Sequence, residues 1–336
     1  MTNSQAHWVA PLFRRAGQAV ESMTTPHLSV LIFHRVLEGS DPLFPGEMDA
    51  PRFDRLMSLV SQSFNVLTVG DASIGLKKGS LPPRAMAITF DDGYADNESI
   101  ALPILQRHGL KATFFVATGF LDGGRMWNDT VIETIRAASV DTLDLSSFGM
   151  GLVNLGSADQ RRAVIESLLF MIKYLSLPER EDALERLRHI VGSPTLPDDL
   201  MMRSEQVRNL HRAGMEIGGH TVNHPILRVL PDFEARSEIQ KGKQALESLV
   251  GAPVDVFAYP NGKPDKDYDQ RHRDMVRELG FKCAVTTASG VGTEKSPSFE
   301  LPRFTPWDRS PTRWLGRLWA QRLRRQAHAT ALTDMA

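Results

Sequence analysis

The sequence predicts an α/β fold in which parallel strands are covered by outer helices. Short apolar runs, each typical of a buried strand, recur along the chain at 28–33, 85–90, 112–117, 215–219, 254–259 and 281–287. Helical patterns separate them, for example at 52–62, 96–108, 232–250 and 269–279. Short candidates near Val66 and Arg303 raise the number of strands to about eight. Alternation of this kind is characteristic of parallel sheets whose connections are helices.

Length and composition suit one large folded domain, or one with an elaboration. The 336 residues, 42% of them hydrophobic, suffice to bury a full α/β core. A net charge of −1, with no basic stripe interleaved with aromatic residues through the middle of the chain, argues against nucleic acid as a partner. The single cysteine, Cys283, lies in the predicted strand 281–287, which excludes an intrachain disulfide and favours a buried thiol. No apolar run approaches the roughly 20 residues that span a bilayer.

Two histidines, His220 and His224, are separated by three residues and follow a short apolar run that ends in glycines. This spacing would place both imidazoles on one face of a helical turn, where a single ion can reach both. Such spacing also occurs by chance on surface helices. Without further candidate ligands, a chance pair on a surface helix would be the better interpretation. Here the pair lies where the chain leaves the predicted strand 215–219, and α/β proteins place their chemistry at such strand ends.

Two adjacent aspartates, Asp91 and Asp92, follow the predicted strand 85–90. In a structural role they would cap the helix that begins near Asp96. That role accounts for one aspartate but not for two, because like charges side by side at a buried strand end are costly unless a cation or a proton intervenes. A metal held by Asp92 and the histidine pair would keep at least one position for water, as catalytic zinc sites do.

The two motifs, Thr89 to Tyr94 and His220 to His224, resemble the first two motifs of the polysaccharide deacetylases of the carbohydrate esterase 4 group, the NodB-homology domain. The resemblance extends from about Leu28 to Arg303, and Phe257 to Gly262 resembles the third motif. It implies that the α/β fold is a distorted, incomplete (β/α) barrel, similar to a TIM barrel, with about seven to eight strands. We therefore expect an N-terminal extension at 1–27, the barrel at 28–310 with a helical insertion at about 121–203, and a basic amphipathic helix and tail at 311–336.

The resemblance also implies roles for individual residues. Asp91 corresponds to the general base, and the metal ligands correspond to Asp92, His220 and His224. The backbone N–H of Tyr259 corresponds to a donor in the oxyanion hole. A strand at 254–259 followed by a turn at 260–262 would aim that amide outward.

The chain departs from the family pattern in two places. The third motif lacks the arginine that many members carry, and no Leu-x-His motif near the C-terminus supplies a general acid. His34, at the end of the first predicted strand, resembles the early acid histidine of the poly-N-acetylglucosamine deacetylase branch and is the candidate acid; its alternative is a histidine satisfied by backbone at a strand end. Arg303 could steer Asp91 from the last strand in place of the missing arginine, although an ordinary surface arginine is at least as good an interpretation.

The alternation of strands and helices breaks between about 121 and 203. Helices are predicted at 128–138, 158–175 and 179–191 with no strand between them. Arriving at the catalytic end, this insertion would wall or cap the substrate groove rather than supply ligands. Trp127 at its start would stack on a sugar ring or, equally, anchor the insertion to the barrel. The candidate substrate contacts are Trp127, Arg303 and Asn261.

Together these features predict a metal-dependent hydrolase that removes N-acetyl groups from amino sugars of a poly- or oligosaccharide. One divalent metal is expected, zinc first, with cobalt, nickel, manganese and iron as alternatives. A glycosidase fits less well, because adjacent aspartates on one strand do not flank a glycosidic bond from both sides. Two alternatives stay open: a related metal-dependent hydrolase of C–N bonds in small molecules, and a glycan-binding protein without turnover.

The C-terminal segment 313–325 contains five arginines and no acidic residue, mixed with tryptophan and leucine. This pattern is compatible with a helix in peripheral contact with an anionic membrane. It fits slightly better a helix that docks on the barrel and exposes its arginines to solvent. Near the N-terminus, Arg14 and Arg15 follow a short apolar group with no long hydrophobic core after them, unlike a signal peptide. A cytoplasmic protein is therefore expected.

Overall fold

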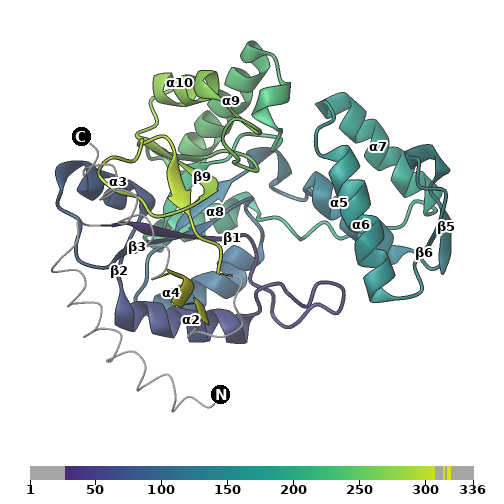
Figure 1. The fold of residues 1–336 in the computed structure, drawn as a ribbon, viewed down its shortest axis with the longest axis horizontal. Helices are drawn as coiled ribbons and strands as arrows, with labels where there is room; N and C mark the ends of the chain where they lie inside the picture. Colours follow the sequence, from purple (N-terminus) through teal and green to yellow (C-terminus); the bar gives the residue numbers. More distant parts are fainter. Residues whose placement is uncertain (1–26, 307–312, 315, 319–336) are drawn as a thin grey trace, which may run out of the picture.

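The computed structural model describes residues 27–306, 313, 314 and 316–318. Its central feature is an eight-stranded sheet whose paired strands are all parallel (Figure 1). The strands are β1 (Ser29–Phe33), β2 (Asn65–Leu67), β3 (Ala85–Phe90), β4 (Thr113–Val116), β7 (Glu216–Gly219), β8 (Val256–Ala258), β9 (Cys283–Ser289) and β10 (Leu301–Arg303). Their order is β1-β3-β4-β7-β8-β9-β10, and β2 pairs with the start of β3.

The ring of strands closes between β1 and Phe304, the residue after β10. The Phe304 N–H donates to the Val30 carbonyl at 2.7 Å, and the Ile32 N–H donates to the Phe304 carbonyl at 3.1 Å. Because a bridge rather than a full strand pair makes this seam, the barrel is nearly closed and distorted. The predicted incomplete (β/α) barrel is thereby confirmed.

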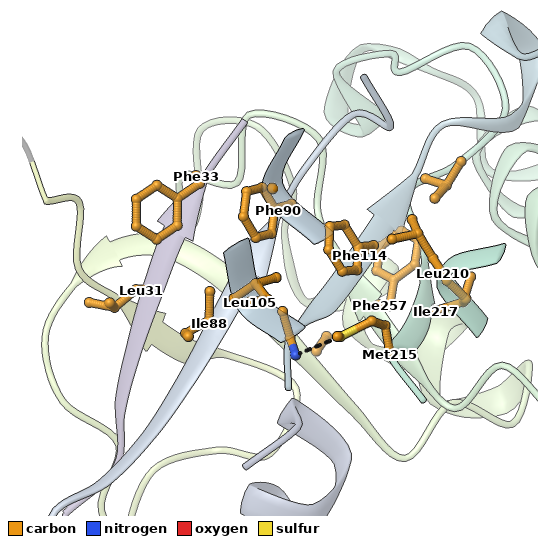
Figure 2. Close-up of a cluster of buried hydrophobic side chains, with 14 of the residues drawn as sticks. Leu31, Phe33, Ile88, Phe90, Leu105, Phe114, Leu210, Met215, Ile217 and Phe257 are labelled. Atoms are coloured by element: carbon orange, nitrogen blue, oxygen red, sulfur yellow. Dashed lines mark hydrogen bonds between the residues drawn. The ribbon is translucent and has the colours of Figure 1, made fainter. Parts of the chain in front are cut away.

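Alternation along the strands separates an inner from an outer apolar layer. In β3, Ala85 and Ala87 join an inner cluster with residues from β1, β4, β8 and β9, whereas Met86, Ile88 and Phe90 belong to the outer core beneath the helices. In the outer layer the ring of Phe90 stacks between those of Phe33 and Phe114, at centroid distances of 5.4 and 4.8 Å (Figure 2). Continuing the inward series, Thr89 and Asp91 lie at the carboxyl end of the barrel interior.

Helices cover the outside of the barrel and close its amino-terminal end. The outer ones are α2 (Ala50–Ser63), the π-helix η1 (Asn97–Ala101) with α4 (Leu102–Arg107), α8 (Ser204–Arg212), α9 (Asp232–Val250) and α10 (Gln270–Glu278). Helix α3 (Val69–Lys78) contributes Val69, Ala72 and Leu76 to the inner cluster. The half-buried Glu216 carboxylate at the start of β7 accepts from the Gly70 N–H in the first turn of α3, which fixes that helix against the barrel floor.

The insertion forms a lobe beside the barrel with its own apolar core (Figure 1). It contains α5 (Trp127–Ala137), α6 (Ala158–Ile172) and α7 (Leu177–Ile190), close to the predicted helices. The expectation that no strand intervenes is wrong, because β5 (Thr142–Asp144) and β6 (Leu152–Asn154) form an antiparallel hairpin between α5 and α6. These three-residue strands are too short for their alternation to be recognised in the sequence.

Two residues of the C-terminal segment pack on the barrel. Trp314 and Leu318 are buried in the outer core, and the indole of Trp314 meets the ring of Phe64 edge-on at 6.2 Å. Arg313 and Arg317 are exposed. These contacts agree with the docked interpretation; the rest of this segment and the extension at 1–26 lie outside the described residues. In the part of the chain that is described, no helix is long and apolar enough to cross a membrane.

Candidate active site

The predicted functional residues meet at the carboxyl ends of the barrel strands. His34 follows β1, Asp91 and Asp92 follow β3, and His220 follows β7. Tyr259 follows β8, and Arg303 is the last residue of β10. This is the end at which (β/α) barrels carry their chemistry.

Arg303 holds Asp91 in a two-pronged pair. Its two terminal nitrogens donate to the two carboxylate oxygens of Asp91, each at 2.7 Å, and its Nε donates to the Thr286 carbonyl at 3.0 Å. Both side chains are buried. Burial by itself would raise the pKa of Asp91, but the charge and hydrogen bonds of Arg303 outweigh it and hold that pKa below its usual value. Arg303 is therefore not a surface arginine: it keeps Asp91 ionised and fixed.

Asp92, His220 and His224 form a compact buried cluster with metal-ligand character. Asp92 Oδ1 lies 3.3 Å from His220 Nε2 and 3.4 Å from His224 Nε2, and one ligand atom from each of the three lies within 4.8 Å of the others. In a tetrahedral site with bonds of about 2.1 Å, two ligand atoms lie about 3.4 Å apart. The three side chains thus fit a divalent metal. No fourth histidine, cysteine or carboxylate of the described residues joins this cluster.

The environment of the two rings differs. His220 Nδ1 donates to the Ala258 carbonyl at 2.7 Å, which turns its Nε2 toward Asp92. His224 Nδ1 is buried and has no partner among the described residues. Burial lowers the pKa of His224 to about 3, so its imidazole is neutral at physiological pH, as a metal ligand must be.

The histidine pair lies in a loop, so the predicted helical turn is wrong. Thr221 (φ 67°) and His224 (φ 49°) both have left-handed backbone, which a helix cannot accommodate. Glu238 on α9 stabilises this loop: its carboxylate accepts from the Val222 N–H at 3.0 Å and the Asn223 N–H at 2.8 Å. Gly242, one turn further along α9, lies so close to the backbone of Thr221 that a Cβ would stand 2.7 Å from the Thr221 carbonyl oxygen.

Asp91 and Asp92 do not cap the following helix. The N-cap position of η1 is Asp96, which makes no side-chain capping bond and instead accepts from the Val36 N–H at 3.0 Å and from Arg35 Nε at 2.8 Å. The two negative charges at the end of β3 have different partners: Arg303 lies beside Asp91, and the two histidines lie beside Asp92.

The other predicted residues are placed as follows. His34 is exposed and lies next to the aspartates along the sheet, because the preceding residue, Phe33, pairs with Phe90 and its carbonyl accepts from the Asp91 N–H at 2.9 Å. The sequence predicted that the Tyr259 N–H is aimed outward from the strand. In the structure this N–H donates to the Val285 carbonyl at 3.4 Å. Asn261 has left-handed backbone (φ 58°) in the turn after β8. Trp127 is 7% exposed, and the guanidinium of Arg180 lies 5.4 Å from its ring, which favours anchoring over sugar stacking.

A second polar cluster, missed in the sequence, joins the lobe to the motif at Asp92. Asp129 on α5 is buried and accepts from the Tyr94 hydroxyl at 3.3 Å, and the guanidinium of Arg35 lies 4.8 Å from the Tyr94 ring. Burial raises the pKa of Asp129 to about 7; Arg35 and Tyr94 partly oppose this, and the charges of Asp92 and Glu133 add to it. This carboxyl is thus held largely neutral below pH 7.

A nearly closed (β/α) barrel with an anchored carboxylate and a histidine–histidine–aspartate cluster at its carboxyl end is the arrangement of a barrel hydrolase. The profile of the polysaccharide deacetylase family matches residues 78–284, more than half of the chain. The chain therefore belongs to the polysaccharide deacetylase family.

Individual relatives are distant. The chain is 20% identical over 278 residues to the putative polysaccharide deacetylase YxkH of Bacillus subtilis, covering 82% of this chain and 70% of the relative. Among solved structures it is similar to the deacetylase PplD of Streptococcus pyogenes, with 18% identity, a TM-score of 0.56 and 84% and 93% of the two chains covered. It is also similar to IcaB of Ammonifex degensii, with 20% identity, a TM-score of 0.55 and 88% and 97% covered. At these identities the likeness concerns the fold.

Proposed function

We propose that this protein is a metal-dependent deacetylase that hydrolyses N-acetyl groups of amino sugars in a poly- or oligosaccharide. One observation carries the proposal: a carboxylate anchored by Arg303 lies directly beside the cluster of Asp92, His220 and His224. A carboxylate that is ionised and fixed suits a general base, and the neighbouring cluster suits a divalent metal.

The proposed chemistry is divided among the residues of the site. A divalent metal held by Asp92, His220 and His224 would act as a Lewis acid on the acetyl carbonyl and the attacking water. Asp91 accepts the proton of that water, and Arg303 holds its carboxylate in position. The Tyr259 N–H donates to the developing oxyanion, and His34 protonates the departing amine, so that acetate and a free amino sugar result.

The Tyr259 amide can take this role because its present bond is weak. At 3.4 Å, its contact with the Val285 carbonyl is longer than the ordinary range of about 2.7 to 3.2 Å for such bonds. An oxyanion is a stronger acceptor than a backbone carbonyl. The amide would therefore exchange a weak partner for a strong one as the reaction proceeds.

Acetate release tests the proposal. Protein stripped of metal and then supplied with zinc, cobalt, nickel or manganese is incubated with N-acetylated chito-oligosaccharides, and acetate and free amines are quantified. We expect both products in equal amounts, with supplied metal only, and about 10²- to 10⁴-fold slower release from an Asp91→Asn variant. Release of ammonia or a ring-opened product from small cyclic amides instead would identify a different C–N hydrolase. Glycan binding without acetate would identify a binding protein.

A further inference from the structure

His224 differs from its partner histidine in how it is held. A histidine that binds a metal normally has its second ring nitrogen hydrogen-bonded, which fixes the orientation of the ring. His220 follows this rule through the Ala258 carbonyl, but Nδ1 of His224 is buried without a partner in the described part of the chain. The position of the His224 imidazole must therefore be determined by its backbone.

That backbone is in an uncommon conformation that needs external support. The φ angle of His224 is 49°, and a left-handed conformation is uncommon for residues other than glycine because the Cβ atom crowds the backbone. Thr221 Oγ1 accepts from the His224 N–H at 3.1 Å. Glu238 binds the amides of the two preceding residues. The remaining polar groups around His224 are the carbonyls of the peptide bonds on either side of its Cα.

Both carbonyls are bound by one arginine of the insertion. Arg180 on α7 donates from one terminal nitrogen to the Asn223 carbonyl at 2.8 Å and from the other to the His224 carbonyl at 3.5 Å. The first carbonyl belongs to the peptide plane before the His224 Cα and the second to the plane after it. One planar guanidinium thus holds the plane before the His224 Cα firmly and contacts the plane after it more loosely, which limits the direction of the Cα–Cβ bond.

The burial of Arg180 indicates a specific role for its charge. Arg180 is 6% exposed, and no carboxylate of the described residues forms an ion pair with it; its guanidinium lies against the Trp127 ring instead. Burial lowers the pKa of Arg180 to about 10, although the charges of Glu238 and Glu181 oppose this. A buried cation without an ion-pair partner is costly, and a helical lobe could fill this space with an apolar side chain at lower cost.

We propose that Arg180 is a positioning residue of the metal centre and that the insertion, through it, is a structural part of that centre. The inference rests on the proposed metal site and goes beyond it. It also replaces the expectation that the insertion only shapes the groove: Arg180 supplies no ligand, but it fixes the backbone of one.

Cobalt binding tests this inference without depending on turnover. Wild-type protein and an Arg180→Gln variant are stripped of metal and titrated with Co²⁺, and the visible absorption of the bound ion reports its coordination. We expect about 10- to 100-fold weaker binding and an altered spectrum for Arg180→Gln, the usual range when a residue that orients a metal ligand is changed. Arg180→Lys retains the charge and can reach one carbonyl, so its affinity should lie between the two.

A matched control separates positioning from simple support of the lobe. Arg161, also in the insertion, donates to the Leu155 and Ile135 carbonyls at 2.8 and 2.7 Å, both within the lobe. Arg161→Gln should lower the melting temperature but leave cobalt affinity and spectrum unchanged. Two outcomes would overturn this inference alone. The first is an equal loss of cobalt affinity in Arg180→Gln and Arg161→Gln. The second is wild-type cobalt affinity in Arg180→Gln or, if that variant does not fold, in Arg180→Lys. A wild-type protein that takes up no cobalt would overturn the proposed metal site as well.

Discussion

Arg303 and Asp91 are 212 positions apart in the sequence, yet both carboxylate oxygens of Asp91 accept hydrogen bonds from one guanidinium at 2.7 Å. The arginine comes from β10 and the aspartate from the end of β3, on opposite sides of β1 in the ring of strands. The pair resolves a problem posed by the sequence, namely why two adjacent aspartates can be buried together. One has an arginine and the other has two histidines.

Replacing Arg303 should impair catalysis through Asp91. Arg303→Met leaves a buried carboxylate without its cation, so the pKa of Asp91 should rise and the acidic limb of the rate profile should move to higher pH. The variant should also lose about 3 to 5 kcal/mol of stability, as is usual when one partner of a buried ion pair is removed. Steady-state rates between pH 5 and pH 9 and thermal unfolding measure both effects. An unchanged acidic limb in a folded variant would show that Arg303 does not act on the base.

Changing Asp91 or Asp92 to asparagine should have different effects on metal content and on turnover. Asp92→Asn removes a charged ligand, so metal content and activity should fall together. Asp91→Asn should keep the metal and lower kcat by about 10² to 10⁴, because an amide cannot accept the proton of water. Elemental analysis combined with acetate release distinguishes the two. Loss of metal from Asp91→Asn would mean that the two roles are assigned to the wrong residues.

His34→Ala should reduce turnover and retain the metal. If the imidazole must be protonated to release the amine, the variant should also lose the alkaline limb of the pH–rate profile. His108→Ala provides the control, because His108 contacts Asp54 at 2.9 Å, in the outer helices away from the strand ends. A His34→Ala enzyme with a normal rate and an unchanged profile would leave the acid unidentified.

Asp129 should make the stability of the protein depend on pH. In the unfolded chain its pKa lies near 3.9, and in the folded protein it is about 7. Between these values the folded state binds the extra proton, so this group stabilises the protein as pH falls from about 7 to 4 and destabilises it above pH 7. Asp129→Asn should therefore raise the melting temperature relative to wild type at pH 8, and the difference should shrink toward pH 5.

The control for Asp129 is a carboxylate with the opposite shift. Burial would raise the pKa of Asp41, but hydrogen bonds from Arg136 and the Leu43 N–H lower it below its usual value. The contribution of Asp41 to stability is present above the pKa that it has in the unfolded chain. This contribution is lost as the pH falls through the lower pKa that it has in the folded protein. Asp41→Asn should therefore be less stable than wild type at pH 8. If Asp129→Asn shows the same sign as Asp41→Asn, the carboxyl of Asp129 is ionised in the folded protein.

The barrel was predictable because parallel strands are buried on both faces. Continuous apolar runs such as Ala85–Phe90 therefore stand out from the helical pattern around them. The metal cluster was predictable from residue types and strand ends. The loop that carries its two histidines was not predictable. A three-residue spacer suits a helical turn equally well, and Thr221 is β-branched, a residue type in which left-handed backbone is a genuine exception.

The supporting residues were not predictable for a different reason. Glu238 and Arg180 act on backbone groups of the loop at 220–224, from 15 or more positions away in sequence. The sequence around each of them has the pattern of an ordinary helix with charged residues, so nothing in it marks either residue as special. Only the packing of α7 and α9 against that loop gives them a function.

Closure of the barrel at Phe304 has a consequence for biosynthesis. A chain emerging from the ribosome presents Asp91, and later the metal ligands, long before β10 has been made. Until β10 reaches β1, Asp91 lacks the guanidinium that lowers its pKa in the folded protein. We expect nascent chains and chains cut before Arg303 to lack a competent base even where the metal ligands have assembled. Catalytic competence would thus arise only after residue 303 has been made and has reached the barrel.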